Sequence, residues 1–319
     1  MQRAKIDPEI LAFIDAVRVE WAKYPPLETI ALSEARAIAE KVRAPWTKGG
    51  PVMASTREHV IETPKGSIRI RVLFPPGCPS PAPAMLYSHG GGYTLFSIDT
   101  HDRLMREYAG LGGFAVVAVD YPLSPEAKYP VALDLITELV LWLKANAEGI
   151  GLDADRLALG GDSAGANLSV ATALRLRDRD EGAVVKAVLS NYAGFLIGCS
   201  DEAELMYGGQ DSVMGREEAL YYWSNYLQDM SQADDPFVSP LRADLRGLPP
   251  TLLVVAECDI IAEHSYAMAE RLRGAGVESE CKIYRGAPHS FLEAMSVSKL
   301  AREAISDGAR FVAKHIVAR

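Results

Sequence analysis

The sequence contains few cysteines, and their spacing argues against both a disulfide framework and a structural zinc site. The 319 residues include four of them, Cys78, Cys199, Cys258 and Cys281, and no Cys-x-x-Cys pair. Scattered cysteines of this kind are typical of reduced thiols. Charges interrupt the first fifteen residues throughout, so they do not form the apolar core of a signal peptide. We therefore expect a cytoplasmic protein without disulfides.

Long apolar runs and positive charge are also scarce. The richest apolar stretch, Phe114 to Val119, is long enough for one strand and far too short to cross a membrane. Acidic residues outnumber basic ones by 42 to 33, which gives a net charge of −9. This balance disfavours binding to nucleic acids and to anionic membrane surfaces, so we expect neither as a partner.

Motifs that bind metals or nucleotides are missing as well. The sequence has no His-Glu-x-x-His or comparable metal-ligand spacing, no Gly-x-Gly-x-x-Gly and no P-loop with its lysine. We therefore expect neither a metal ion nor another cofactor. What the chain does have is ample material for a core, because 49% of its residues are hydrophobic and 24% are charged.

Short apolar segments alternate with helical patterns along most of the chain. We predict strands at residues 58–63, 68–74, 84–88, 114–120, 156–160, 184–191, 251–256 and 280–284. We predict helices at residues 8–21, 27–42, 100–110, 132–147, 164–176, 263–274 and 297–316. Such alternation predicts an α/β fold in which helices flank a mostly parallel central sheet.

Two segments stand outside this alternation. Residues 1–50 are helical, and residues of about 195–235 form a helical insertion rich in aromatic side chains: Tyr207, Tyr221, Tyr222, Trp223 and Tyr226. We expect both segments to form a helical cap on an α/β domain that spans residues 51–319. The aromatic side chains have two open interpretations, namely packing of the cap on the core and lining of an apolar pocket.

The pentapeptide Gly161-Asp-Ser-Ala-Gly165 lies between a predicted strand and a predicted helix. A serine at such a turn adopts a strained conformation that exposes its hydroxyl, and the flanking glycines permit the sharp turn and close packing. The N-terminus of the following helix is oriented toward the serine, so its partial positive charge favours developing negative charge there. Ser163 is therefore a candidate nucleophile.

A serine nucleophile needs a base, and the chain has six histidines. His289 follows the last predicted strand, so it should lie at the same sheet edge as Ser163. Four others are weaker candidates: His59 and His315 suit surface or packing roles, His101 suits a helix cap, and His264 lies on a helix. Three acids could orient the base, namely Asp259 after the strand at 251–256, its rival Glu257 and the weaker Glu263.

The segment His89-Gly-Gly-Gly92 directly follows another predicted strand. Consecutive glycines allow backbone N–H groups to approach a developing oxyanion without obstruction by side chains. The N–H groups of Gly91, Gly92 and Ala164 are the candidate donors, and we expect His89 to orient the loop. Gly90 and Asp162 complete the two motifs. The chain order Ser163, Asp259, His289 is the one expected for an α/β-hydrolase.

Together, these two motifs resemble the hormone-sensitive-lipase family of α/β-hydrolases, in particular its bacterial carboxylesterase and acetyl esterase branch. Residues 120–126 and 151–156 also look like family segments, and the resemblance covers most of the chain. It implies an α/β-hydrolase fold with a cap, with Ser163 as nucleophile, His289 as general base and Asp259 as its orienting acid. The sequence departs from the family pattern at Pro122, Ala166, Ile260-Ile261 and Ser290, and none of these changes removes a reactive group.

The resemblance further implies a serine carboxylesterase that hydrolyses short-chain carboxylic esters through an acyl-enzyme. Its partner would be a small-molecule ester, and a homodimer is an open alternative to a monomer. A second hypothesis is hydrolysis of amides or lactones by the same residues. A third is a small-molecule receptor on the same fold, which the presence of His289 disfavours.

Overall fold

A single sheet of eight strands forms the centre of the computed structural model, which describes residues 5–209 and 212–317. The strands are β1 (Ser55–Thr63), β2 (Gly66–Phe74), β3 (Ala82–Ser88), β4 (Ala115–Asp120), β5 (Leu152–Asp162), β6 (Val185–Asn191), β7 (Thr251–Cys258) and β8 (Ser279–Pro288). Their spatial order is β1-β2-β4-β3-β5-β6-β7-β8. β2 pairs antiparallel with both β1 and β4, and every other pair is parallel. The predicted α/β class with a mostly parallel sheet is confirmed.

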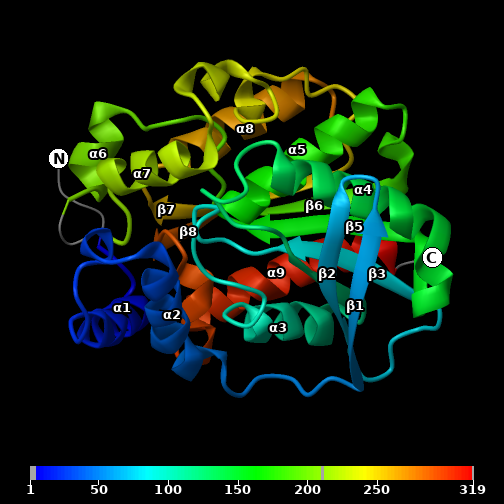
Figure 1. Cartoon of the computed structure of the whole chain (residues 1–319), viewed down its shortest axis with the longest axis horizontal. Coiled ribbons are helices and arrows are strands. Elements are labelled where there is room, and N and C mark those ends of the chain that lie inside the picture. The colour runs from blue at the N-terminus through cyan, green and yellow to red at the C-terminus, as the bar shows by residue number, and fades with distance from the viewer. Residues whose placement is uncertain (1–4, 210–211, 318–319) are drawn as a thin grey trace.

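Helices cover both faces of this sheet (Figure 1). They are α3 (Asp102–Gly112), α4 (Val131–Asn146), α5 (Ala164–Asp178), α8 (Ala262–Gly274) and α9 (Lys299–Ile316). The apolar side chains of α4, α5 and α8 share one core cluster, whereas those of α3 and α9 share the other. The central strands are therefore buried on both sides, and all seven residues of β3 are buried. The edge strand β1 is mostly exposed.

The N-terminal segment and the mid-chain insertion contribute four more helices: α1 (Pro8–Trp21), α2 (Leu32–Arg43), α6 (Asp201–Tyr207) and α7 (Arg216–Tyr226). Figure 1 shows all four at the left of the molecule, with α1 and α2 below α6 and α7. α1 buries Ile10, Phe13 and Ile14 in the same core cluster as side chains of the sheet. Both segments thus pack on the α/β core. Among the described helices, none is long and apolar enough to cross a membrane.

The predicted helix over residues 27–42 is wrong in its first part. The chain forms a short 3-10 turn at Leu27–Thr29, and α2 begins only at Leu32. Ile30 between them is extended, with φ −122° and ψ 166°, so the backbone hydrogen bonds of one continuous helix cannot form. The terminal helix, predicted to begin at residue 297, begins two residues later, at Lys299. It follows a 3-10 segment at Phe291–Ser296.

Candidate active site

Ser163 lies on the sharp turn between β5 and α5. Its backbone takes φ 52° and ψ −119°, a conformation that L-residues rarely adopt. A Cβ atom at either Gly161 or Gly165 would overlap the backbone at Ser88, so only glycine permits this approach of helix and strand. The strained turn is therefore maintained by tight local packing, and it presents the serine hydroxyl at the carboxyl end of the sheet.

Three side chains from different strand ends form a continuous hydrogen-bonded chain. Ser163 Oγ lies 2.9 Å from His289 Nε2, and His289 Nδ1 lies 2.6 Å from Asp259 Oδ2. Both His289 and Asp259 are buried. Because the carboxylate of Asp259 can only accept, His289 donates from Nδ1 and its Nε2 is left to accept the serine proton. This is the arrangement of a nucleophile, a base and an orienting acid.

The two rival acids have other partners. Glu257 Oε2 accepts a hydrogen bond from the backbone N–H of Gly286 at 2.8 Å. Glu263 Oε1 accepts one from the backbone N–H of Ser200 at 2.6 Å. The structure thus brings Asp259 to the histidine and places Glu257 and Glu263 elsewhere.

The pKa of His289 is set by opposing effects. Burial lowers it, whereas the negative charge of Asp259 and the hydrogen bond to it raise it, with smaller contributions from Asp162 and Glu218. The net result is a pKa above the ordinary value of 6.5. The surroundings of His289 therefore stabilise its protonated form, which is the form a base passes through after it removes a proton from serine.

The glycine loop after β3 lies beside Ser163. Gly91 and Gly92 line the same cavity as Ser163, and they adopt φ 109° and φ 60°. The carboxylate of Asp162 accepts hydrogen bonds from the N–H of Gly90 at 3.2 Å and from the hydroxyl of Tyr87 at 2.9 Å. Asp162 therefore ties the glycine loop to the residue next to the nucleophile.

His89 fixes the start of the same loop. Its Nδ1–H donates to the carbonyl of Gly90 at 2.6 Å, and its ring stacks on Tyr121 with centroids 4.5 Å apart. The Tyr121 hydroxyl in turn donates to the His89 carbonyl at 2.8 Å. Burial, together with the neighbouring His101, lowers the pKa of His89 to about 3. His89 is therefore neutral near pH 7 and suited to orienting the loop.

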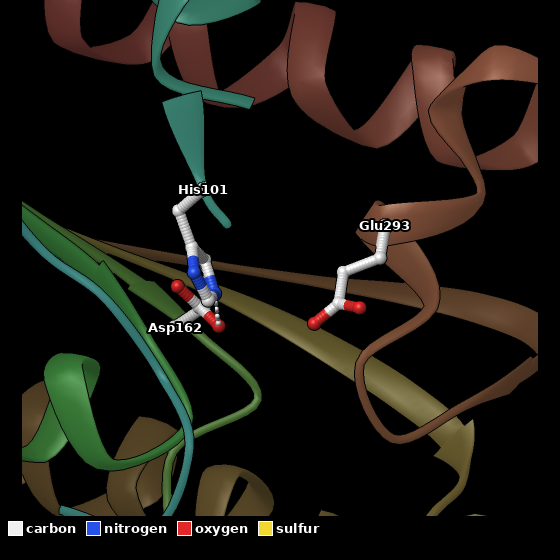
Figure 2. A group of neighbouring side chains, drawn as sticks. All are labelled: His101, Asp162 and Glu293. Carbon is white, nitrogen blue, oxygen red and sulfur yellow. Dashed lines mark ion pairs between the residues drawn. The ribbon is translucent and has the colours of Figure 1, made fainter. Parts of the chain in front are cut away.

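A buried cluster of polar side chains next to the active site brings together His101, Asp162 and Glu293 (Figure 2). His101 Nε2 lies 3.4 Å from Asp162 Oδ2, and Glu293 points toward this pair from the opposite side. The donor atoms lie within 4.8 Å of one another, close enough to hold a metal ion. However, the guanidinium of Arg43 already forms an ion pair with Glu293 and thus supplies a positive charge there. We assign the cluster a structural role.

The structure around this cluster corrects the sequence prediction for His101 and reveals two residues that the sequence analysis did not identify. His101 does occupy the N-cap position of α3, but the prediction that it caps the helix is wrong for its side chain, which bonds no N–H group of α3 and is buried against Asp162 instead. Arg43 and Glu293 escaped the sequence analysis because they belong to no motif. The only signal is that Glu293 is a lone charge in the apolar run Phe291–Met295.

A cavity of about 300 Å³ opens over Ser163 and His289. Its apolar lining comes from the N-terminal helix, the glycine loop and the histidine loop: Ile10, Phe13, Ile14, Val17, Trp21, Leu95, Phe96 and Phe291. Of the five aromatic residues noted in the insertion, Tyr222 lines this cavity and Trp223 lines a smaller hollow beside Ser163. Tyr226 stacks on Tyr93 with centroids 3.7 Å apart and belongs to the core. Both interpretations of the insertion aromatics therefore apply, and Trp223 combines them, since it also belongs to the core.

The family model of the α/β-hydrolase fold matches residues 85–293, which contain the glycine loop and all three residues of the hydrogen-bonded chain. The chain belongs to this family. The family resemblance predicted from the two motifs is therefore confirmed.

Several solved structures resemble this α/β-hydrolase along most or all of its length. An esterase from the archaeon Pyrobaculum calidifontis is 30% identical with a TM-score of 0.87, and the match covers 98% of this chain and 100% of that one. A thermostable carboxylesterase cloned from a metagenomic library is 31% identical with a TM-score of 0.86, covering 90% and 98%. A thermostable esterase from Pseudomonas putida is 26% identical with a TM-score of 0.92, covering 100% of both chains.

Two departures of this hydrolase from the family pattern lie next to the hydrogen-bonded chain. In the acid loop, the N–H of Ile261 donates to Asp259 Oδ1 at 3.1 Å, so this loop still orients the acid. In the histidine loop, Ser290 adopts φ 60°, in the left-handed region that favours glycine. The loop thus keeps a conformation suited to glycine, although serine occupies the position.

Proposed function

We propose that this hydrolase is a serine carboxylesterase that acts on short-chain carboxylic esters through an acyl-enzyme. The observation that carries the proposal is the hydrogen-bonded chain from Ser163 through His289 to Asp259, which opens directly into the cavity. The similarity to three solved esterases supports the same activity.

Acylation follows from this geometry. Ser163 Oγ attacks the ester carbonyl carbon while His289 Nε2 takes its proton, and Asp259 stabilises the resulting imidazolium. The carbonyl oxygen becomes an oxyanion, and the N–H groups of Gly91, Gly92 and Ala164, three residues that line the cavities beside Ser163, are the proposed donors to it. His289 then gives the proton to the leaving alcohol as the carbon–oxygen bond breaks.

Deacylation repeats these steps with water. His289 removes a proton from a water molecule, whose oxygen attacks the acyl carbon and forms a second tetrahedral intermediate. Collapse of this intermediate breaks the bond to Ser163 Oγ, which regains its proton from His289. The carboxylic acid leaves and the site returns to its starting state.

The size and lining of the cavity support a small ester as the substrate. A volume of about 300 Å³ lies at the lower end of the range for ligand pockets. Residues 1–50 and 195–235 would act as its cap, since α1 and α7 supply much of the lining. We further propose a cytoplasmic location, which the four unpaired cysteines support, and neither nucleic acid nor membrane as a partner.

The Ser163→Ala variant tests the proposal. We expect kcat for p-nitrophenyl acetate to fall by at least about 10⁴-fold, because the base then has no nucleophile to activate. A fluorophosphonate probe should label Ser163 in the unmodified protein, and mass spectrometry of the peptide would locate the label. Retained esterase activity in the variant, or absence of labelling, would contradict the proposal.

A panel of amides and lactones separates the ester hydrolase from its alternatives. The first half-reaction is common to all three substrate classes, so only relative kcat/KM values distinguish them. We expect kcat/KM for p-nitrophenyl acetate to exceed kcat/KM for the matching anilide by a large factor. Binding without turnover of any ester would instead indicate a receptor.

A further inference from the structure

The cavity over Ser163 is lined by the ionisable side chains of two arginines and two glutamates: Arg18, Arg43, Glu218 and Glu293. Three of them already have partners. Arg43 forms an ion pair with Glu293. Arg18 donates to the Ser212 carbonyl at 3.4 Å and lies 3.6 Å from a carboxylate oxygen of Asp15. The charges of these three are therefore compensated within the protein.

Glu218 differs from the other three. It lies on α7, and its carboxylate accepts a hydrogen bond from the Tyr222 hydroxyl at 3.1 Å. No Lys, Arg or His side chain in the described part of the chain forms an ion pair with it. Glu218 lines the same cavity as Ser163 and His289, and its carboxylate helps to raise the pKa of His289, whereas burial raises the pKa of Glu218 itself above its ordinary value. The uncompensated charge of the cavity lining is therefore negative and lies near the reacting groups.

Aromatic rings surround the same space. Phe13, Trp21 and Tyr222 line the cavity together with Glu218, and Phe96 already carries Arg43 at 4.7 Å from its ring centroid. The faces of such rings attract cations, most strongly in places that exclude water. A carboxylate beside aromatic rings is a combination that recognises ammonium groups.

We propose that the cavity selects esters that carry an ammonium group, which Glu218 and the neighbouring aromatic rings bind. This inference rests on the proposed carboxylesterase function and narrows its substrate class. The net charge of −9 acts in the same direction, because it attracts cationic substrates and speeds their encounter with the site.

A matched pair of esters tests the proposal. Acetylcholine and 3,3-dimethylbutyl acetate share the acetyl group and the shape of the alcohol, and they differ by a carbon in place of the charged nitrogen. We expect kcat/KM of the unmodified hydrolase to be about 10-fold higher for the cationic ester. Since both esters form the same acetyl-enzyme, the difference should lie in the binding and acylation steps that kcat/KM reports.

Glu218→Gln should reduce this ratio severalfold, because the amide keeps the size of the side chain and removes its charge, while the aromatic rings remain. The ratio is the proper readout, since any effect of Glu218 on His289 acts on both esters. Glu217→Gln is the matched control. It removes the same charge from the preceding residue, which is exposed and lies outside the cavity lining, and should leave the ratio unchanged.

Inhibition of the unmodified hydrolase gives a second measurement that does not depend on a variant. Choline should inhibit hydrolysis of p-nitrophenyl acetate competitively, and about 10-fold more strongly than 3,3-dimethylbutanol. Equal inhibition by the two alcohols would overturn the inference. So would a preference for an anionic ester such as monoethyl succinate, which would assign the selectivity to Arg43 instead.

Failure of the inference and failure of the proposed function give different results. If the hydrolase cleaves both acetyl esters at a ratio near 1 in all three proteins, the ammonium preference is refuted and the esterase function stands. If no ester is cleaved and Ser163 resists the fluorophosphonate probe, both are refuted.

Discussion

The pKa of His289 determines the pH range in which this residue can act as the base for Ser163. The base accepts the serine proton only when Nε2 is unprotonated, so kcat/KM should rise with pH through the pKa of His289 in the free enzyme. Burial lowers that pKa, and the negative charges of Asp259, Asp162 and Glu218 raise it above 6.5. We therefore expect an acidic limb centred above pH 6.5.

The measurement is kcat/KM for p-nitrophenyl acetate from about pH 5 to about pH 9. Glu218→Gln should move the acidic limb to lower pH, because the removed carboxylate helps to keep His289 protonated. A midpoint below 6.5 in the unmodified protein would contradict the assignment of net stabilisation to these charges.

A second prediction for single residues concerns which of two acids, Asp259 or Glu257, orients His289. Asp259→Asn should lower kcat by about 10⁴-fold, since an amide no longer favours the tautomer that accepts the serine proton. Glu257→Gln is the control, because Glu257 accepts a hydrogen bond from Gly286 and does not contact His289. A larger loss in Glu257→Gln than in Asp259→Asn would reverse the assignment.

Sequence alone identified the residues whose positions follow from strand ends. Ser163, Asp259 and His289 each come directly after a strand of a parallel sheet, and the carboxyl ends of such strands meet at one edge. Arg43, Glu218 and Glu293 could not be predicted in this way. They reach the site from α2, α7 and a 3-10 segment, and their approach depends on how these elements pack.

Among the structural elements, the glycine loop packs tightly against the insertion at Gly92. A Cβ atom at Gly92 would overlap the ring of Tyr222, and the φ of 60° would strain any other residue. Gly92→Ala should therefore displace the loop and lower kcat by about 10²- to 10³-fold, the usual cost of losing one oxyanion donor.

Gly149→Ala is the matched control for this element. It makes the same chemical change at a glycine that has open space around its Cβ position. We expect its kcat to stay within about twofold of the unmodified protein, as is usual for a surface substitution. Unfolding monitored by circular dichroism should show that both variants fold.

The second element to test is α2, which binds the core through Arg36. The guanidinium donates to the carbonyls of Thr94 at 2.8 Å and Ser124 at 2.7 Å, and it forms a bidentate pair with Glu126. Arg36→Gln should cost about 2 kcal/mol of unfolding free energy and lower kcat more than it raises KM, because Thr94 belongs to the glycine loop. Lys41→Gln, exposed on the same helix, should change neither quantity.

The elements themselves could be predicted mainly where hydrophobic periodicity is strong. α1 begins and ends at the predicted residues, since Asp7 caps it and Pro8 suits its first turn. The predicted helix over residues 27–42 failed because the pattern of apolar residues continues through Ile30, where the backbone is extended. Periodicity does not report such a local break in the hydrogen-bond pattern.

For the whole molecule, the N-terminal segment from residue 5 to residue 50 contributes buried apolar side chains to the packing on the α/β core. Ile10, Phe13, Ile38 and Val42 are buried, and burying each such side chain is worth roughly 1.5–3 kcal/mol. A chain that begins at residue 51 should therefore be inactive and prone to aggregate, because it exposes the apolar surface that these side chains cover.

Size-exclusion chromatography and esterase assays would test this expectation. Co-expression with a separate fragment of residues 1–50 should restore soluble protein and activity, since the lost contacts are noncovalent. A truncated chain that stays monomeric and fully active would show that the N-terminal segment is dispensable.

The arginines of α2 also limit how such enzymes can be re-engineered. Arg36 binds the glycine loop, and Arg43, seven residues further on, pairs with Glu293 on the segment after His289. Exchanging the N-terminal segment for that of a relative would thus replace two kinds of residue in one step: those that line the cavity and those that bind the loops of the active site. Libraries that randomise α1 while retaining these two arginines should contain many more active clones than libraries that exchange both helices.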